Sequence, residues 1–291
     1  MRLGVLILPE DPWPEARRKW QRAEQLGFDH AWTYDHLAWR GLRDSPWFGA
    51  VPTLAAAAAV TDTIRLGTLV ASPEVRHPVP FAREVVTLDE IAGGRFTLGI
   101  GAGSGGWDAS VLGHEPWTPF ERADRFAEFV DLLDLLLRQR VTTFAGRYWT
   151  AHEARTHPGC VQQPRVPFAV AASGRRSLRV AARHGDLWAW SGPRTYRGPL
   201  LGAADGAAAT ARQIARLDEA CVAEGRDPAT IGRLVVTGPV LDGGLRSPDA
   251  FAEVREAYAA VGVTDLVVHW PRREEPYAGD ENVLEAVAHG G

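Results

Sequence analysis

The stretch GGRFTLGIGAGSGGW, residues 93–107, sets the pattern from which the fold can be worked out. Gly93 and Gly94 form a turn, and the short apolar run from Phe96 to Ile100 is typical of a buried strand. Glycines replace side chains directly after this run, where the backbone can therefore come close to a ligand. The stretch predicts a strand that ends in a ligand-facing loop.

Gly101, Gly103 and Gly106 also match the Gly-x-Gly-x-x-Gly spacing of dinucleotide-binding folds. That fingerprint belongs to the first strand of a domain and opens directly into a helix, with an acidic residue about 20 residues later. Here at least three strand-like segments come first, and Pro116 and Pro119 precede the next helical period. We therefore reject a dinucleotide-binding interpretation of this loop.

Outward from this stretch, an apolar strand followed by a loop and a helix recurs along the chain. Runs that are apolar throughout suit strands covered on both faces, and eight such units predict a (β/α)8 barrel of the α/β class. A doubly wound sheet is the alternative fold. We expect a single domain over residues 1–291, with a small hairpin insertion, residues 141–144 and 147–149, between strands four and five. The expected barrel strands are residues 3–8, 30–34, 64–70, 96–100, 168–172, 186–190, 234–241 and 265–269.

Composition limits the partners that this chain can have. Of its 291 residues, 45% are apolar and 23% charged, and the net charge of −4 leaves no basic face for nucleic acid and no polybasic membrane anchor. Cys160 and Cys221 lack metal-ligand spacing, so we expect free thiols and no metal site. Without a signal-like start or a long apolar run, we expect a cytoplasmic protein with a small-molecule partner.

In a (β/α)8 barrel the residues that follow each strand face one common mouth. Polar and aromatic residues gather at these positions and form a coherent set of candidates. They are Asp35, His36 and Trp39 after strand two, Ala102, Gly103 and Ser104 after strand four, Ser173, Gly174 and Arg175 after strand five, Trp190 and Ser191 at strand six, and His269 and Trp270 after strand eight.

The segment from Ala172 to Ser177 joins strand five to a helix and can form an anion site. Backbone N–H groups at the helix start, the helix dipole, a serine hydroxyl and Arg175 could converge on one phosphate. A serine N-cap followed by solvated arginines explains the same residues equally well. The barrel context favours phosphate, because such barrels often bind phosphate in a late loop.

His36 is the candidate for proton transfer, because its side chain can exchange a proton near neutral pH. Asp35 could orient or charge it, although neighbouring residues at a strand end need not point the same way. A structural histidine remains the alternative. Tryptophans at loop positions, namely Trp13, Trp39 and Trp107, with Trp270, suit the walls of a site for a flat ring.

Seven segments together resemble the bacterial luciferase-like family of flavin-dependent oxidoreductases. The match extends over nearly the whole chain, and the order and spacing of the segments carry it. They are AEQLGFD (23–29), YDH (34–36), TDTIRLGT (61–68), RHP (76–78), LDEIAGGRFTLGIG (88–101), AARHGDLW (181–188) and GVTD (262–265).

The resemblance implies a barrel that binds coenzyme F420, a deazaflavin, or alternatively FMN. It implies a non-prolyl cis peptide at Leu69-Val70, His36 beside the reactive ring carbon, and phosphate on the 173–175 loop. The cofactor contacts would be Leu69, Val70, Ala102, Gly103, Ser104, Ala172, Ser173, Gly174, Arg175, Trp190 and Ser191. The substrate contacts would be Trp13, Trp39, Trp107, His269 and Trp270.

One position departs from the family. Its deazaflavin-dependent sugar-phosphate dehydrogenases carry a catalytic glutamate after strand four, where this chain has Ser104. We therefore expect F420-dependent hydride transfer that reduces an activated C=C or C=N bond, with His36 and Asp35 as catalytic residues. The alternatives are an FMN-dependent monooxygenase and a non-catalytic flavin-binding barrel. We also expect a separate enzyme to supply reduced cofactor, and a homodimer.

Overall fold

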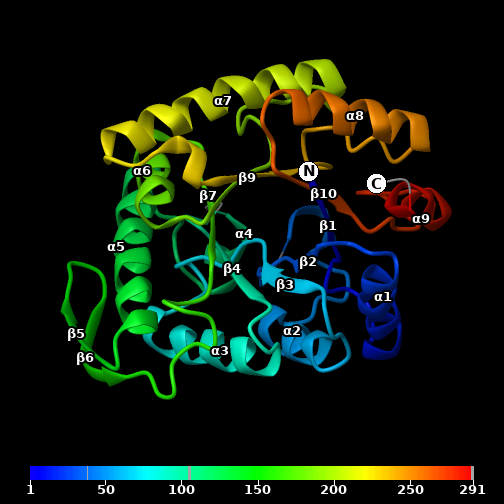
Figure 1. Ribbon diagram of the computed structural model, residues 1–291. Coiled ribbons are helices and arrows are strands. Elements are labelled where there is room, and N and C mark those ends of the chain that lie inside the picture. The colour runs from blue at the N-terminus through cyan, green and yellow to red at the C-terminus, as the bar shows by residue number, and fades with distance from the viewer. Residues whose placement is uncertain (38, 104–105, 290–291) are drawn as a thin grey trace.

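The central feature of the computed structural model is a closed barrel of eight parallel strands (Figure 1). The structure describes residues 1–37, 39–103 and 106–289. Around the barrel the strand order is β1-β10-β9-β8-β7-β4-β3-β2, which confirms the predicted (β/α)8 fold. The strands are β1 (Arg2–Leu6), β2 (His30–Thr33), β3 (Arg65–Thr68), β4 (Phe96–Gly101), β7 (Phe168–Ala171), β8 (Leu187–Trp190), β9 (Gly232–Val236) and β10 (Asp265–His269).

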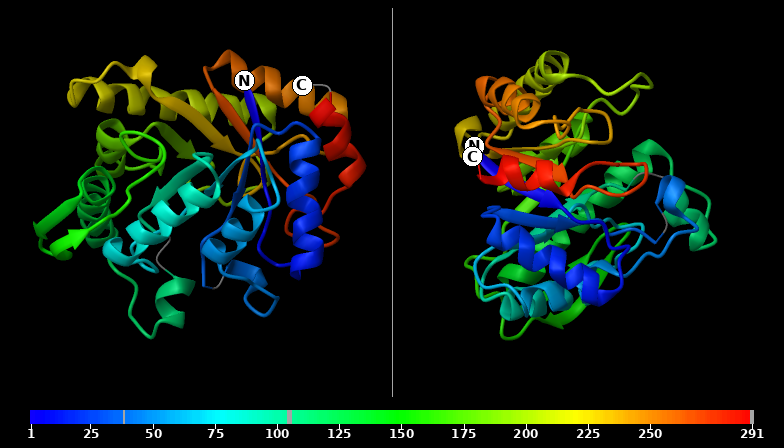
Figure 2. Two further views of the ribbon diagram at one scale, coloured as in Figure 1. Left: turned by 60° about the horizontal axis from the view of Figure 1, so that its bottom comes forward. Right: turned by 90° about the vertical axis from the view of Figure 1, so that its right-hand side faces the viewer.

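Helices surround the barrel and cover the outer faces of its strands (Figures 1 and 2). None of the helices in the described ranges has both the length and the apolarity needed to cross a membrane. The α-helices are α1 (Trp13–Gln25), α2 (Ala50–Ala58), α3 (Pro78–Ile91), α4 (Trp107–Val111), α5 (Pro119–Arg138), α6 (Arg175–His184), α7 (Ala203–Ala223), α8 (Pro248–Ala260) and α9 (Glu281–His289), with short 3-10 turns η1 (Arg40–Leu42) and η2 (Pro228–Thr230).

A small antiparallel hairpin, β5 (Val141–Ala145) and β6 (Thr150–Arg155), lies outside the helices, between α5 and β7 in sequence (Figure 1). The expectation that residues 147–149 form its second strand is wrong, because these residues form the turn. The Glu128 carboxylate accepts hydrogen bonds from the backbone N–H groups of Arg147, Tyr148 and Trp149, at 2.9, 2.7 and 2.6 Å. This fixes the turn and moves the strand start to Thr150.

The strands are apolar on both faces because each separates two packed layers. Leu6, Trp32, Ala189, Leu234 and Val267 fill the barrel interior, and intervening residues pack against the helices. Several predicted strands are too long at their ends. β9 ends at Val236, and Thr237 still donates its N–H to Val267 of β10 at 2.9 Å. The chain turns away at Gly238, whose φ of +109° ends the extended conformation.

The opening stretch forms the predicted turn, strand and loop. Gly93 and Gly94 have φ angles of +58° and +81°, in the left-handed region that favours glycine. Within β4, Gly99 lies so close to β3 that an added Cβ would overlap the Thr68 carbonyl oxygen. The Thr68 hydroxyl also donates to the Gly99 carbonyl at 2.7 Å. The Leu69-Val70 peptide that follows β3 is cis, as the family resemblance predicted.

Replacing Gly99 by alanine should destabilise the fold, because the new methyl group would push β4 away from β3. We expect the free energy of unfolding to fall by about 1–3 kcal/mol, which is typical of overpacking in a core. Urea unfolding followed by circular dichroism measures this. Gly41→Ala is the matched control, since an added Cβ there meets nothing within 4 Å. Equal stabilities of the two variants would contradict this account of the β3 and β4 contact.

Candidate functional site

His36 lies at the barrel mouth, just after β2, and is held by an acid from another loop. Its Nδ1 is 2.7 Å from Asp108 Oδ2, and the other carboxylate oxygen accepts the Leu37 N–H at 2.7 Å. Asp108 is buried in the short helix α4, which follows the glycine loop. Because Asp108 occupies Nδ1, any proton that His36 exchanges with a ligand must pass through Nε2.

Asp35 does not support His36, so the expected Asp35 and His36 pair is wrong in its geometry. The Asp35 side chain instead forms a bidentate ion pair with Arg76, through Nε at 2.9 Å and Nη2 at 2.6 Å. Burial alone would lower the pKa of Arg76, but the hydrogen bonds and charge of Asp35, with Glu84, more than offset this and raise it. Asp35 therefore anchors the β3–α3 loop to the end of β2.

The sequence prediction did not include Asp108, because it considered only neighbours in the chain as partners of His36, and Asp108 is 72 residues away. Consecutive residues of an extended segment point to opposite sides, so Asp35 and His36 diverge. A signal was present, however. Asp108 directly follows the glycine loop, and the loops after strands two and four were both predicted to lie at the mouth.

An aromatic cluster forms another side of the mouth and includes two of the expected substrate residues. His269 Nε2 is 2.8 Å from the Tyr34 hydroxyl, and the His269 ring stacks on Tyr277 at 3.6 Å. Trp39 stacks between Tyr34 and Trp47, with centroid distances of 5.3 and 6.2 Å. Burial lowers the pKa of His269 to about 3, an effect only partly offset by the Thr237 backbone. His269 is therefore a neutral wall and not a proton donor.

Trp270 does not face the mouth, so its predicted substrate contact is wrong. It follows His269 and points to the opposite side, where it is buried against the helix layer. Its indole N–H donates to Glu281 Oε1 of α9 at 3.0 Å. Trp13 and Trp107 begin α1 and α4 and are partly exposed, at 38% and 43%. The Arg43 guanidinium lies 5.0 Å from the Trp107 ring centroid.

Beside the mouth, a groove of about 580 Å³ brings together several expected cofactor residues. Ser173, Gly174 and Trp190 line it, together with residues of the loop after β8 and of α7. We name it the α6–α7 groove. Its lining is Ser173, Gly174, Trp190, Pro193, Arg194, Thr195, Ala209, Arg212, Gln213 and Arg216.

The start of α6 is open to the groove and suits an anion. Gly174 is the N-cap, so the alternative of a serine N-cap does not apply, and no side chain caps the helix. Beyond its chain neighbours, an added Cβ at Gly174 would meet only Ser177 Oγ, at 4.0 Å. Arg175, the first helical residue, is exposed, and Gln213 holds the Ser173 carbonyl with a 2.9 Å hydrogen bond. These residues fit a group that ends in phosphate.

The remaining expected cofactor residues lie at the ends of β3, β4, β7 and β8. Val70 packs against Gly99 and Gly101, where added Cβ atoms would meet its methyl groups. Gly103 has a φ of +79° and lies against the Glu74 carboxylate. Ala102 is half-buried, Ala172 and Leu69 are buried, and Ser191 is exposed. Ser104 lies outside the described residues, and the described residues hold no cluster of three or more His, Cys, Asp or Glu side chains suited to a metal.

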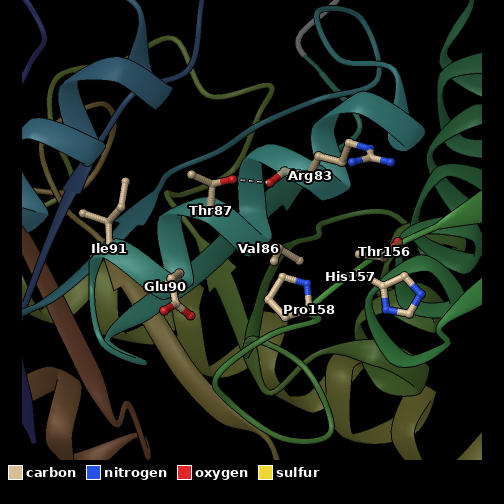
Figure 3. Close-up of a pocket in the computed structure, with 8 residues that line it drawn as sticks. All are labelled: Arg83, Val86, Thr87, Glu90, Ile91, Thr156, His157 and Pro158. Carbon is tan, nitrogen blue, oxygen red and sulfur yellow. Dashed lines mark hydrogen bonds between the residues drawn. The ribbon is translucent and has the colours of Figure 1, made fainter.

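A second, smaller pocket of about 200 Å³ lies elsewhere (Figure 3). Five residues of α3 and the segment Thr156 to Pro158 line it; those of α3 are Arg83, Val86, Thr87, Glu90 and Ile91. Figure 3 also shows the Thr87 hydroxyl, which donates to the Arg83 carbonyl at 2.8 Å. It includes none of the residues predicted to bind cofactor or substrate. The mouth and the α6–α7 groove, which hold most of those residues, are therefore the candidate site.

Fold and site together define a (β/α)8-barrel protein with a histidine and carboxylate pair at the mouth and, beside it, a groove at the uncapped start of α6. The model of the family described as luciferase-like monooxygenase matches residues 1–282. The chain belongs to this family.

Related proteins agree with this assignment. The F420-dependent glucose-6-phosphate dehydrogenase of Beutenbergia cavernae is 34% identical, over 87% of this chain and 86% of its own. The F420-dependent hydroxymycolic acid dehydrogenase of Mycobacterium tuberculosis is 32% identical, over 73% of this chain and 55% of its own.

Two solved structures share the fold across 99% of this chain. The coenzyme F420-dependent tetrahydromethanopterin reductase of Methanopyrus kandleri has a TM-score of 0.77 at 19% identity and is covered over 97% of its length. An F420-dependent secondary alcohol dehydrogenase has a TM-score of 0.81 at 18% identity and is covered over 98%. At these identities the likeness concerns the fold alone.

The buried His269 should make stability depend on pH. The unfolded chain takes up this proton near pH 6.5, whereas the folded protein resists it down to about pH 3. The free energy of unfolding should therefore fall as the pH drops from about 6.5, by up to about 1.4 kcal/mol per pH unit for this one group.

The double variant Tyr34→Phe/His269→Phe removes both members of the hydrogen bond and should flatten this part of the profile. Urea unfolding between pH 7 and pH 4.5 measures it. His152→Gln, at an exposed position on the hairpin, should leave the profile unchanged. An unaltered slope in the double variant would show that His269 does not cause the pH dependence.

Proposed function

We propose that this protein is a coenzyme F420-dependent oxidoreductase that transfers a hydride between reduced deazaflavin and a small organic substrate. The observation that carries the proposal is the His36 and Asp108 pair at the mouth. Asp108 follows the glycine loop along the chain, and a groove suited to phosphate lies beside the mouth. The F420-dependent relatives named above support the choice of cofactor. When bound, coenzyme F420 gives or accepts a hydride at its deazaflavin ring.

The residues of this chain would bind, orient and protonate. Asp108 fixes the His36 ring and keeps Nδ1 engaged, so that Nε2 can deliver the proton that completes reduction of a double bond. Trp39, Tyr34 and His269 form an aromatic wall that would limit water near the reacting atoms. The groove would hold the phosphate end of the cofactor and so fix the ring at the mouth.

We propose reduction of an activated C=C or C=N bond as the direction of the reaction. Ser104 supports this, because the resemblance places the glutamate of the sugar-phosphate dehydrogenases at this position, and serine cannot serve as their acid. The relatives named as dehydrogenases oxidise their substrates. Because we propose the opposite direction here, we do not propose their substrates for this chain.

FMN-dependent monooxygenation is the second candidate. It is supported by the family description and by 4-hydroxyprotoasukamycin monooxygenase of Streptomyces nodosus, which is 33% identical over 61% of this chain and 48% of its own. Both functions would need reduced cofactor from a separate enzyme.

We further propose that residues 1–291 form one domain and that the protein is a homodimer. Exposed Val111, Leu112 and Phe120 support association, and light scattering would test it.

Binding should separate the two cofactors. We expect titration of the purified protein to give saturable quenching of tryptophan fluorescence with F420, because Trp190 lines the groove, and at least about tenfold weaker binding of FMN. Turnover with reduced F420 should consume no oxygen. Tight binding of FMN alone, with oxygen consumption, would favour the monooxygenase and contradict the proposal.

Substitutions at the His36 and Asp108 pair should lower turnover and leave cofactor affinity unchanged. His36→Asn should lower kcat about 100-fold or more, the lower range for loss of a general acid, and Asp108→Asn about tenfold or more, since the ring loses its orienting carboxylate. The Kd for F420 should stay within about threefold. Asp249→Asn, at an exposed position in the first turn of α8, is the charge-matched control. Full turnover in His36→Asn would exclude the assigned role.

A further inference from the structure

The α6–α7 groove contains more positive charge than a single phosphate requires. Three of its lining residues are Arg194, Arg212 and Arg216, and none of its described lining residues is Asp or Glu. Arg212 and Arg216 are four residues apart on α7, and such residues lie on one face of a helix. Figure 1 shows α6 and α7 side by side, so this face adjoins the start of α6.

These arginines lack a directly paired carboxylate within the described part of the chain. None of the three forms an ion pair there, and the hydrogen-bond partner of Arg216 is the neutral amide of Gln213, at 3.1 Å. Neighbouring arginines on α6 behave differently, since Arg179 and Arg183 both pair with Glu224 at 2.6 Å. The protein as a whole has a net charge of −4, so the positive charge of the groove is opposite in sign to that of the whole protein.

Arg194 adds to this excess from the loop after β8. Burial lowers its pKa, and the charge of Arg122 lowers it further, while the Glu74 carboxylate partly offsets both. Burial and the nearby charge of Arg122, which does not itself line the groove, therefore both disfavour the charged form of Arg194. An anion bound beside Arg194 would offset these effects.

The shape of the groove agrees with its charge. Its volume of about 580 Å³ lies within the range of sites that hold whole small molecules, and one phosphate would fill only a small part of it. The open start of α6 contributes one end, through Ser173 and Gly174, and Arg212 and Arg216 contribute the α7 side. Gln213 connects the two, because it holds the Ser173 carbonyl and also accepts from Arg216.

We propose that the α6–α7 groove binds the polyanionic tail of the cofactor, with the phosphate at the start of α6 and the following glutamyl carboxylates on Arg212 and Arg216. This rests on the proposed function. Guanidinium groups suit carboxylates because their paired N–H donors match the two oxygens. FMN ends at its phosphate and would leave the α7 arginines without a partner. The groove would thus favour the longer anion.

Forms of coenzyme F420 that differ only in the tail provide the test. The dissociation constants of F420-2, which carries two glutamyl residues, and F420-0, which carries none, are measured by isothermal titration calorimetry at 50 and 300 mM KCl. We expect F420-2 to bind about tenfold more tightly at the lower salt concentration, and the advantage to shrink at the higher one, because exposed ion pairs are screened.

The variant Arg212→Gln/Arg216→Gln should abolish the advantage of F420-2 and leave the Kd of F420-0 within about twofold. Arg212→Gln alone, which disturbs no hydrogen bond of the described chain, should remove about half of the effect on a logarithmic scale. Arg138→Gln/Arg140→Gln is the matched control. It removes two exposed arginines at and just after the end of α5, which lies at the opposite end of the barrel from the mouth, and the advantage should remain.

The results distinguish this inference from the function on which it rests. If the protein binds F420-0 and F420-2 equally, or if the double variant keeps the advantage, the tail assignment is wrong while F420 dependence stands. If neither form binds, both proposals are wrong. Inorganic phosphate and glucose 6-phosphate are titrated in the same way. If either binds the wild type but not Arg212→Gln/Arg216→Gln, and does not compete with F420-2, the groove serves a substrate anion, which also overturns the assignment.

Discussion

Pairing of β1 with β10 closes the barrel and thereby puts the carboxyl ends of all eight strands around one mouth. Buried Asp265, which pairs with Arg2 in this register, also binds the Arg2 guanidinium and His30 Nε2, each at 3.0 Å. Burial would raise the pKa of Asp265, but the hydrogen bonds from His30, Arg2 and Thr264 outweigh it and lower the pKa. The carboxylate therefore stays charged and links three strands at the base of the closed sheet. His36, Trp39 and the α6–α7 groove share one end of the molecule because of this closure.

The site depends on contacts between loops that are distant in sequence. Asp108 reaches His36 across 72 residues, and Gln213 reaches Ser173 across 40. Arg76 in turn connects the β3–α3 loop to Asp35 at the end of β2. Each of these polar side chains bonds to a group on another segment, and one of them, Gln213, lies on α7, so the segments around the mouth position one another. Precise placement of a flat cofactor needs this rigidity, since the loops alone have no regular hydrogen bonding.

Two kinds of chemistry are separated in space within the site. Near His36 and Trp39 the surroundings are aromatic and partly buried, which suits hydride and proton transfer away from bulk water. The α6–α7 groove is exposed and cationic, which suits recognition of phosphate and carboxylate. A cofactor with a flat ring and a charged tail would extend from one region to the other. The proposed oxidoreductase function rests on this division, together with membership of the luciferase-like family.

The sequence by itself determined the barrel, the order of its strands, and the positions that line the mouth, because apolar runs and glycine or proline breaks are local signals. The family resemblance added the cis peptide at Leu69-Val70. Only the tertiary structure decided which way each side chain points and what it meets. Residues adjacent in an extended segment face opposite sides. His269 therefore lies at the mouth whereas Trp270 packs in the helix layer, and His36 bonds to Asp108 and not to Asp35. Likewise, the arginines of α7 became part of a groove only when α7 packed beside α6. Such contacts depend on the three-dimensional approach of distant segments. The sequence indicated which loops would meet, but not which side chains would pair.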